Sequence, residues 1–109
     1  MKRGFIRTIT TLMAIVLTAK AGRIAYGDHI ETWYNLDMSK VIERSDKMIG
    51  LSDLYWIRDD GVKMYGPWVI VAAHKSKIRY SRVQTSLGEG IILDTHETDP
   101  EVYDIATTW

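Results

Sequence analysis

The hydrophobic positions after residue 21 follow two different periods, one helical and one extended. Over residues 38–49 the apolar side chains recur at every third or fourth position, which is typical of one face of an α-helix. Asp37 or Ser39 can cap the start of this helix, and Gly50 suits the position after its end because glycine tolerates a left-handed turn. The positions of the predicted face are Met38, Val41, Ile42, Ser45, Met48 and Ile49. We therefore predict an α-helix over about residues 37–49.

The pattern becomes extended from Leu54 onward, where short apolar runs are separated by turn residues. Asp59-Asp60-Gly61 lies between two such runs and predicts a hairpin, and Gly66-Pro67 predicts a second turn. The continuous apolar run at 68–73 predicts a strand buried on both faces. Six strands are predicted in all, over residues 55–58, 62–65, 68–73, 82–86, 91–95 and 102–106, with a turn at 87–90.

Six short strands at close spacing and one helix predict a mainly β fold, a small six-stranded β-barrel with one N-terminal amphipathic α-helix. Residues 22–35 show no strong period and are predicted to form a lead-in, in which Thr32-Trp33-Tyr34 can start a strand. A chain of 109 residues supplies one hydrophobic core, and neither a repeat nor a linker divides it. Residues 22–109 are therefore predicted to form a single domain that includes the helix.

The first 21 residues have the three parts of a secretory signal. Lys2, Arg3 and Arg7 precede an uncharged run of 12 residues, and Ala19-Lys20-Ala21 places small residues at the two positions that a signal peptidase inspects. The run is shorter than the roughly 20 residues that span a bilayer. We predict a signal peptide or an N-terminal membrane anchor at 1–21; the alternative is an amphipathic or buried helix that stays in the protein.

Charge and cysteine content exclude several classes of function. The 14 basic and 14 acidic residues balance, and without residues 1–21 ten basic residues face fourteen acidic ones, so a nucleic-acid partner is not expected. The absence of cysteine excludes disulfides, thiolate zinc sites and a cysteine nucleophile. No phosphate-binding loop, dinucleotide motif, nucleophile elbow or zinc-protease motif occurs, so no cofactor is expected.

Two aspartates in the last third are the best catalytic candidates. Asp94 ends an aliphatic strand, and Asp104 lies inside the final strand between Tyr103 and Ile105. Apolar neighbours raise the pKa of a carboxyl group by desolvation, which suits a general acid. If the two strands pair, the two carboxyl groups can meet. The alternative is structural: Asp94 caps a turn with Thr95, and Asp104 accepts backbone N–H bonds.

Other polar and aromatic residues are weaker candidates. The loop that holds His96, Glu97, Asp99 and Glu101 has hard metal ligands, but its spacing matches no standard site, so a solvated acidic loop is favoured and no metal is expected. His74 follows the buried strand, where it is either catalytic or a polar strand end. Tyr80 and Tyr103 are candidates for stacking on sugar rings, whereas Trp56 and Trp68 flank hairpins and are predicted to belong to the core.

Four segments resemble the three-aspartate (3D) domain family of small double-psi β-barrels, found in exported proteins of Gram-positive bacteria and in some of their phages. They are Asp59-Asp-Gly-Val-Lys-Met-Tyr-Gly66, Val69-Ile-Val-Ala-Ala73, Thr85-Ser-Leu-Gly-Glu-Gly-Ile-Ile-Leu-Asp-Thr95 and Tyr103-Asp-Ile-Ala106. The resemblance covers roughly residues 31–109. It implies a secreted or envelope-associated bacterial protein that contacts a membrane only through residues 1–21, if these are retained.

The resemblance extends to membrane-bound lytic transglycosylase A and the rare lipoprotein A-like proteins. It implies cleavage of peptidoglycan between N-acetylmuramic acid and N-acetylglucosamine without water. Asp104 matches the acid/base of these enzymes, and Asp94 matches the aspartate that opens the family's Asp-Thr-Gly motif. Thr95, His96, Tyr103, Tyr80 and His74 are the expected substrate-binding residues.

The chain departs from the family pattern at two places. His96-Glu97 stands where the family has two glycines, and His74 replaces the third aspartate. Glycines let a sugar approach the backbone closely, so bulkier residues narrow such a cleft. The alternative function is therefore a catalytically degenerate peptidoglycan-binding module, or a phage or envelope structural module, on the same barrel.

Overall fold

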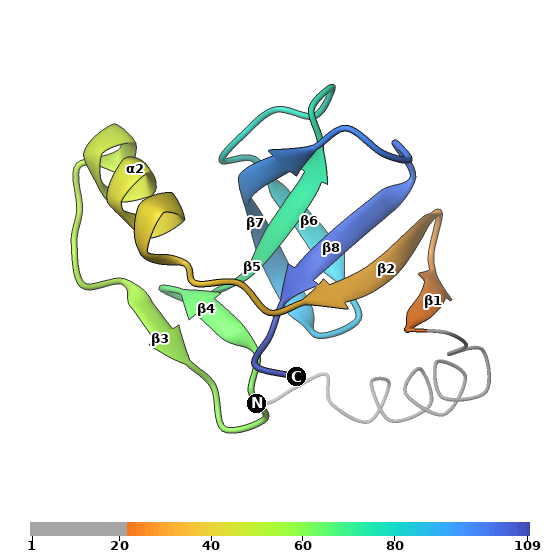
Figure 1. Ribbon diagram of the computed structural model, residues 1–109, viewed down its shortest axis with the longest axis horizontal. Helices are drawn as coiled ribbons and strands as arrows, with labels where there is room; N and C mark the ends of the chain where they lie inside the picture. The colour runs from red at the N-terminus through yellow and green to blue at the C-terminus, as the bar shows by residue number, and fades with distance from the viewer. Residues whose placement is uncertain (1–21) are drawn as a thin grey trace.

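Residues 22–109, the part of the chain that the computed structural model describes, form eight β-strands and one α-helix (Figure 1). All six predicted strands are present, but the predicted number is wrong because the lead-in adds two more. The strands are β1 (Arg23–Tyr26), β2 (His29–Tyr34), β3 (Tyr55–Ile57), β4 (Lys63–Tyr65), β5 (Trp68–His74), β6 (Arg82–Thr85), β7 (Gly88–His96) and β8 (Val102–Ala106). The predicted signal peptide or anchor lies outside the described residues. Between residues 22 and 109, no helix is long and apolar enough to cross a membrane.

The strands pair into one mixed sheet built around β5. One path of paired strands runs β1-β2-β8-β5-β4-β3, and β7 pairs with β5 and with β6. Within residues 22–109 these pairings leave the sheet open and do not close it into a ring. The pairs β2–β8 and β5–β7 are parallel, whereas β5 runs antiparallel to both β8 and β4. A strand with neighbours on both edges and side chains buried on both faces needs a continuous apolar sequence, which β5 has.

The predicted lead-in contains two short strands, of which the sequence indicated only Thr32-Trp33-Tyr34 in the second. β1 (RIAY) and β2 (HIETWY) pair antiparallel, and β2 then pairs in parallel with β8, which lies about 70 positions later in the sequence. β2 carries the charged residue Glu31 at a buried position. An apolar period therefore could not reveal these strands, because tertiary pairing stabilises them.

The helix α2 (Ser39–Ile49) begins two residues later than predicted and packs its apolar face against the sheet. Asp37 accepts hydrogen bonds from both the backbone N–H and the hydroxyl of Ser39, so it holds the start of the helix from just outside. Gly50 ends the helix with a φ of 83°, as its position in the sequence indicated. The hydroxyl of Tyr65 in β4 donates to Asp46 at 2.7 Å and links the helix to the sheet.

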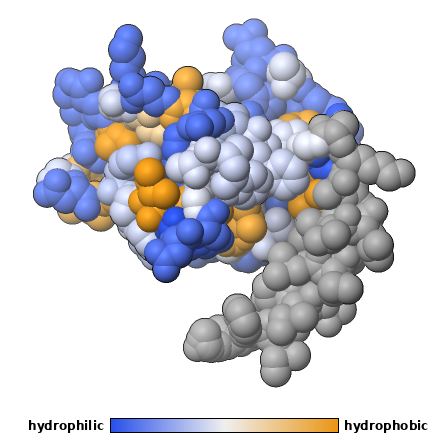
Figure 2. Space-filling model, turned by 60° about the horizontal axis from the view of Figure 1, so that its bottom comes forward, coloured by the Kyte–Doolittle hydropathy of each residue, from blue (hydrophilic) through white to orange (hydrophobic). Residues whose placement is uncertain are grey.

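Both faces of the sheet bury apolar side chains. The helix face, which is the face that α2 covers, has a core of Met38, Val41, Tyr65, Ile70, Ile91, Leu93 and Ala106. The opposite face has a core of Val62, Met64, Val69, Val71, Ala73, Ile92 and Ile105. In the view of Figure 2, the remaining apolar surface is broken into separate spots by hydrophilic side chains.

Two local predictions are wrong. The β6–β7 hairpin turns at Ser86 and Leu87 instead of at 87–90, because Thr85 pairs with Gly88. Gly90 lies inside β7, where an added Cβ would come within 2.7 Å of Cγ2 of Val71, so this glycine serves close strand packing. Trp56 is 46% exposed on the short edge strand β3, whereas Trp68 packs partly buried against the helix-face core.

A buried carboxylate joins β2 to the β6–β7 turn. Glu31 is fully buried and accepts hydrogen bonds from the backbone N–H of Ser86 (3.0 Å), the Ser86 hydroxyl (2.6 Å) and Nε2 of His29 (2.8 Å). The ring of His29 stacks in turn on Tyr103, with 4.6 Å between the ring centroids. Such a carboxylate stabilises the fold only while its donors remain in place.

We predict that Glu31→Ala lowers the free energy of unfolding by about 3–5 kcal/mol, because it leaves buried donors without an acceptor. Ser86→Ala removes one bond to the carboxylate and should cost about 1.5–3 kcal/mol. Glu89→Ala, on the exposed side of β7, is the matched control and should stay within about 0.5 kcal/mol. Urea denaturation measures all three; equal losses for Glu31→Ala and Glu89→Ala would contradict the structural role of Glu31.

Candidate functional site

The two candidate aspartates lie in one row across the sheet. Ala72 of β5 is in register with Asp104 of β8 on one edge and with Asp94 of β7 on the other. Thr32 of β2 extends the row beyond Asp104. We call Thr32, Asp104, Ala72 and Asp94 the aspartate row. The condition that the two aspartate strands pair directly is not met, because β5 separates them; two strand spacings put the backbones of Asp94 and Asp104 about 10 Å apart.

A β-bulge places Asp94 on the helix face. The register between β5 and β7 shifts at Val71/Ala72: Val71 pairs with Ile92, but Ala72 pairs with Asp94, which leaves Leu93 as the extra residue. Without the extra residue, Asp94 would alternate onto the same face as Ile92, because side chains follow a period of two. The bulge therefore brings both carboxyl groups to one side of the sheet.

Asp104 has the environment expected of a general acid. It is half-buried, and its Oδ1 accepts a hydrogen bond of 2.8 Å from the Thr32 hydroxyl. Burial raises the pKa of the Asp104 carboxyl above its usual value, although the Thr32 bond and the charge of His96 act in the opposite direction. Desolvation thus shifts the pKa of this carboxyl in the direction that its apolar neighbours in the sequence predicted.

Asp94 is held by the helix and by its own backbone. Its Oδ1 accepts the N–H of Thr95 at 2.9 Å, and Nη2 of Arg44 lies 3.4 Å away. The same Nη2 donates to the carbonyl of Leu93, the bulge residue, at 2.9 Å. The contact with Thr95 agrees with the alternative given by the sequence, in which Asp94 has a structural role as the cap of a turn with Thr95. Arg44 adds an ion pair that no sequence pattern indicated.

Tyr34 faces the same two aspartates from β2. Burial raises the pKa of its hydroxyl above the usual value, and the negative charges of Asp94 and Asp104 raise it further. The hydroxyl oxygen is buried and has no hydrogen-bond partner within the described part of the chain. The group therefore stays protonated at all physiological pH values, as a neutral hydroxyl whose hydrogen-bonding capacity is unused among residues 22–109.

His74 of β5 and His96 of β7 lie opposite each other in the sheet, but their ring nitrogens contact different residues. His74 and His96 are in register, with their ring centroids 6.1 Å apart. Nε2 of His96 lies 2.9 Å from the carbonyl of Val102, the first residue of β8, and its Nδ1 lies 3.0 Å from the hydroxyl of Thr98 in the loop between β7 and β8. Nδ1 of His74 accepts the N–H of Ser76, which leaves its Nε2 as the N–H donor.

Three other predicted site residues do not join the aspartate row. Thr95 directly follows Asp94, and Tyr103 directly precedes Asp104, so both side chains point to the opposite face of the sheet. On that face, the Thr95 hydroxyl accepts a hydrogen bond from Arg79, and the Tyr103 ring stacks on His29. Tyr80 packs against the helix-face core, with a φ of 72°. The site on the helix face thus contains Asp104, Asp94, His96 and His74.

Sequence reasoning missed Thr32, Tyr34 and Arg44. The alternation of Thr32 and Tyr34 along a possible strand was the only signal for the first two. Nothing along the chain could pair Arg44 with Asp94, because the contact depends on how α2 packs on β7. No three His, Asp or Glu side chains of residues 22–109 gather closely enough to hold a metal ion, and the loop from His96 to Glu101 forms no such group.

No protein-family model, curated protein or solved structure matches this chain.

The raised pKa of Asp104 predicts how stability depends on pH. Because the folded-state pKa lies above the unfolded-state pKa, the native protein binds more protons between these values, and its free energy of unfolding falls as the pH rises through that window. Asp104→Asn removes this loss, so the difference in melting temperature between this variant and the wild type should move in favour of the variant as the pH rises above about 4. Thr32→Val removes a bond that lowers the pKa and should make the loss larger. Parallel wild-type and Asp104→Asn curves in thermal denaturation would contradict the assigned shift.

Proposed function

We propose that the aspartate row is the general-acid site of a protein that cleaves peptidoglycan glycan strands. The observation that carries the proposal is Asp104, a half-buried carboxyl with a raised pKa that faces the side of the sheet shared with Asp94. A carboxyl that keeps its proton nearer to neutral pH can give it to a leaving-group oxygen. Asp104 is the proposed acid, and Asp94 is the supporting carboxylate held by Arg44.

One carboxyl group suffices for the proposed reaction. Asp104 protonates the oxygen between N-acetylmuramic acid and N-acetylglucosamine, and the bond from that oxygen to C1 breaks. The C6 hydroxyl of the same muramic acid attacks C1 and closes a 1,6-anhydro ring, while its proton returns to Asp104. A pair of carboxyl groups about 5 Å apart, as in ordinary retaining glycosidases, is not required because the substrate supplies the nucleophile.

The proposal also includes a double-psi topology for the sheet and export of the protein to the cell envelope. The parallel pairs β2–β8 and β5–β7, joined through antiparallel β5 and β8, support a crossed topology of the double-psi kind, because a simple meander would contain only antiparallel pairs. The basic start, short apolar core and Ala19-Lys20-Ala21 support export to the cell envelope.

A second candidate function is binding to peptidoglycan without cleavage. It is favoured by His96, because one ring nitrogen contacts Thr98 in the loop after β7 and the other contacts the carbonyl of Val102 at the start of β8, so the segment that replaces the family's glycines is held at both sides. A loop held in this way can narrow the approach to Asp104 while leaving a glycan contact surface. Retention on peptidoglycan with no change in its chemistry would distinguish this function.

The test is a digest of Gram-positive sacculi by the full chain, followed by mass spectrometry of the released material. We expect 1,6-anhydro-muropeptides from the wild type, with the yield falling as the pH rises past the pKa of Asp104. Asp104→Asn should lower the rate by about 10²–10⁴-fold, which is the usual contribution of a general acid. Asp59→Asn, in an exposed turn, is the charge-matched control and should retain activity.

Each other outcome has a defined meaning. An active Asp104→Asn variant would remove Asp104 from the reaction. No release by any variant, together with sedimentation of the protein with sacculi, would favour the binding function. No release and no sedimentation would contradict both functions.

A further inference from the structure

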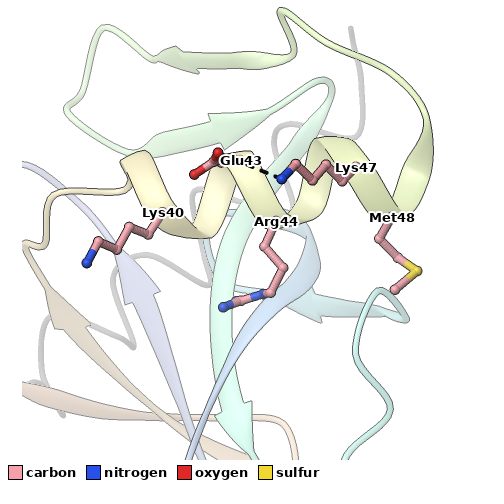
Figure 3. Close-up of a pocket in the computed structure, with 5 residues that line it drawn as sticks. All are labelled: Lys40, Glu43, Arg44, Lys47 and Met48. Atoms are coloured by element: carbon pink, nitrogen blue, oxygen red, sulfur yellow. Dashed lines mark ion pairs between the residues drawn. The ribbon is translucent and has the colours of Figure 1, made fainter.

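The helix α2 carries a row of positive charge beside the aspartate row. Lys40, Arg44 and Lys47 are spaced four and three positions apart, so they lie along one side of the helix; we call them the basic stripe. Together with Glu43 and Met48 they line a pocket of about 440 Å³ (Figure 3). The pocket thus has three cationic side chains and one carboxylate among its described lining.

Two carboxylates neutralise part of the positive charge of this pocket: Asp94 lies 3.4 Å from Nη2 of Arg44, and Glu43 lies beside Lys47. Glu43 lies 3.9 Å from Lys47, and both side chains are more than two-thirds exposed, so their attraction is largely screened by solvent. Residues 22–109 as a whole carry ten basic and fourteen acidic side chains. The basic stripe is therefore a local site of opposite sign on an acidic domain, which favours an anionic ligand at this place.

Arg44 joins the pocket to the candidate acid site. Its side chain points from α2 toward the strands (Figure 3), where Nη2 contacts the Leu93 carbonyl and, at 3.4 Å, Asp94. The side chain is still 41% exposed, and its Nε is buried without a hydrogen-bond partner among residues 22–109. A guanidinium group has five N–H donors in a planar fork that suits a carboxylate, and the contacts seen here use only part of that capacity.

From this geometry we infer that the basic stripe binds carboxylate groups carried by the glycan, so that an acidic glycan lies across α2 and the aspartate row. The inference rests on the proposed function, which supplies the glycan as the ligand. What it adds is that the ligand must be negatively charged. Arg44 contacts both places, which sets the carboxylate-bearing sugar next to Asp94. Lys40 and Lys47, at either end of the stripe, select acidic over neutral strands.

The test compares two tetrasaccharides of equal length by NMR titration of the full chain. One contains only N-acetylglucosamine and is neutral; the other alternates N-acetylglucosamine with N-acetylmuramic acid, whose lactyl group carries a carboxylate. We expect the acidic ligand to bind more tightly at low salt and the preference to shrink as salt is added. Lys40→Gln/Lys47→Gln should weaken the acidic ligand by about three- to tenfold and leave the neutral one unchanged.

Two variants act as controls. Arg23→Gln removes one positive charge from β1, at the far end of the sheet from α2, and should leave the preference intact (Figure 1). Lys40→Arg/Lys47→Arg keeps both charges and should restore the preference that the glutamine variant loses.

The outcomes separate this inference from the proposed function. Equal affinity for the two ligands, or a preference that survives Lys40→Gln/Lys47→Gln, would overturn the basic stripe as an anion site while leaving the glycan function standing. Binding of the acidic ligand alone, with the expected lysine dependence, would support the anion site and count against a neutral glycan subsite at Asp104. Binding of neither ligand would overturn the inference.

Discussion

The pairing of β5 on both of its edges is the constraint on which the rest of the structure depends. β8 and β4 follow one another along one edge, through Val71–Ala72 and Trp68–Val69, and β7 occupies the other edge. Backbone groups buried between two cores must be hydrogen-bonded, so these partner strands cannot shift independently. The positions of Asp94 and Asp104 follow from this register, since both are aligned on Ala72.

The bulge at Leu93 shows how a local irregularity turns a core strand into part of a site. Ile91 and Leu93 pack into the helix-face core, and the residue after them would ordinarily point away from it. The extra residue brings Asp94 back to the helix face, and Arg44 then binds both the carbonyl of the bulge residue and the Asp94 carboxylate. Helix docking and site geometry are thus stabilised by the same contacts.

The ionisable groups of the helix face have different surroundings. Asp104 lies where burial disfavours its ionised form, whereas Asp94 lies beside a guanidinium group. Burial, with the negative charges of Asp94 and Asp104 adding to it, raises the pKa of the Tyr34 hydroxyl. Two otherwise identical side chains thus have different surroundings: the Asp104 carboxyl is desolvated and hydrogen-bonded to Thr32, and the Asp94 carboxylate has an ion pair with Arg44.

The sequence by itself determined the six strands from Tyr55 to Ala106, the helix and its glycine end, and the two aspartates as candidates, because each depends on residues near one another in the chain. It did not predict β1, and of β2 it indicated only Thr32-Trp33-Tyr34, because β2 depends on its pairing with β8 and β1 on its pairing with β2. Nor could it show that Asp94 and Asp104 lie in one row on either side of β5, that Thr95 and Tyr103 point to the other face, or that Arg44 reaches Asp94. Those features depend on the register, one bulge residue and the docking of α2, and only tertiary packing decides them.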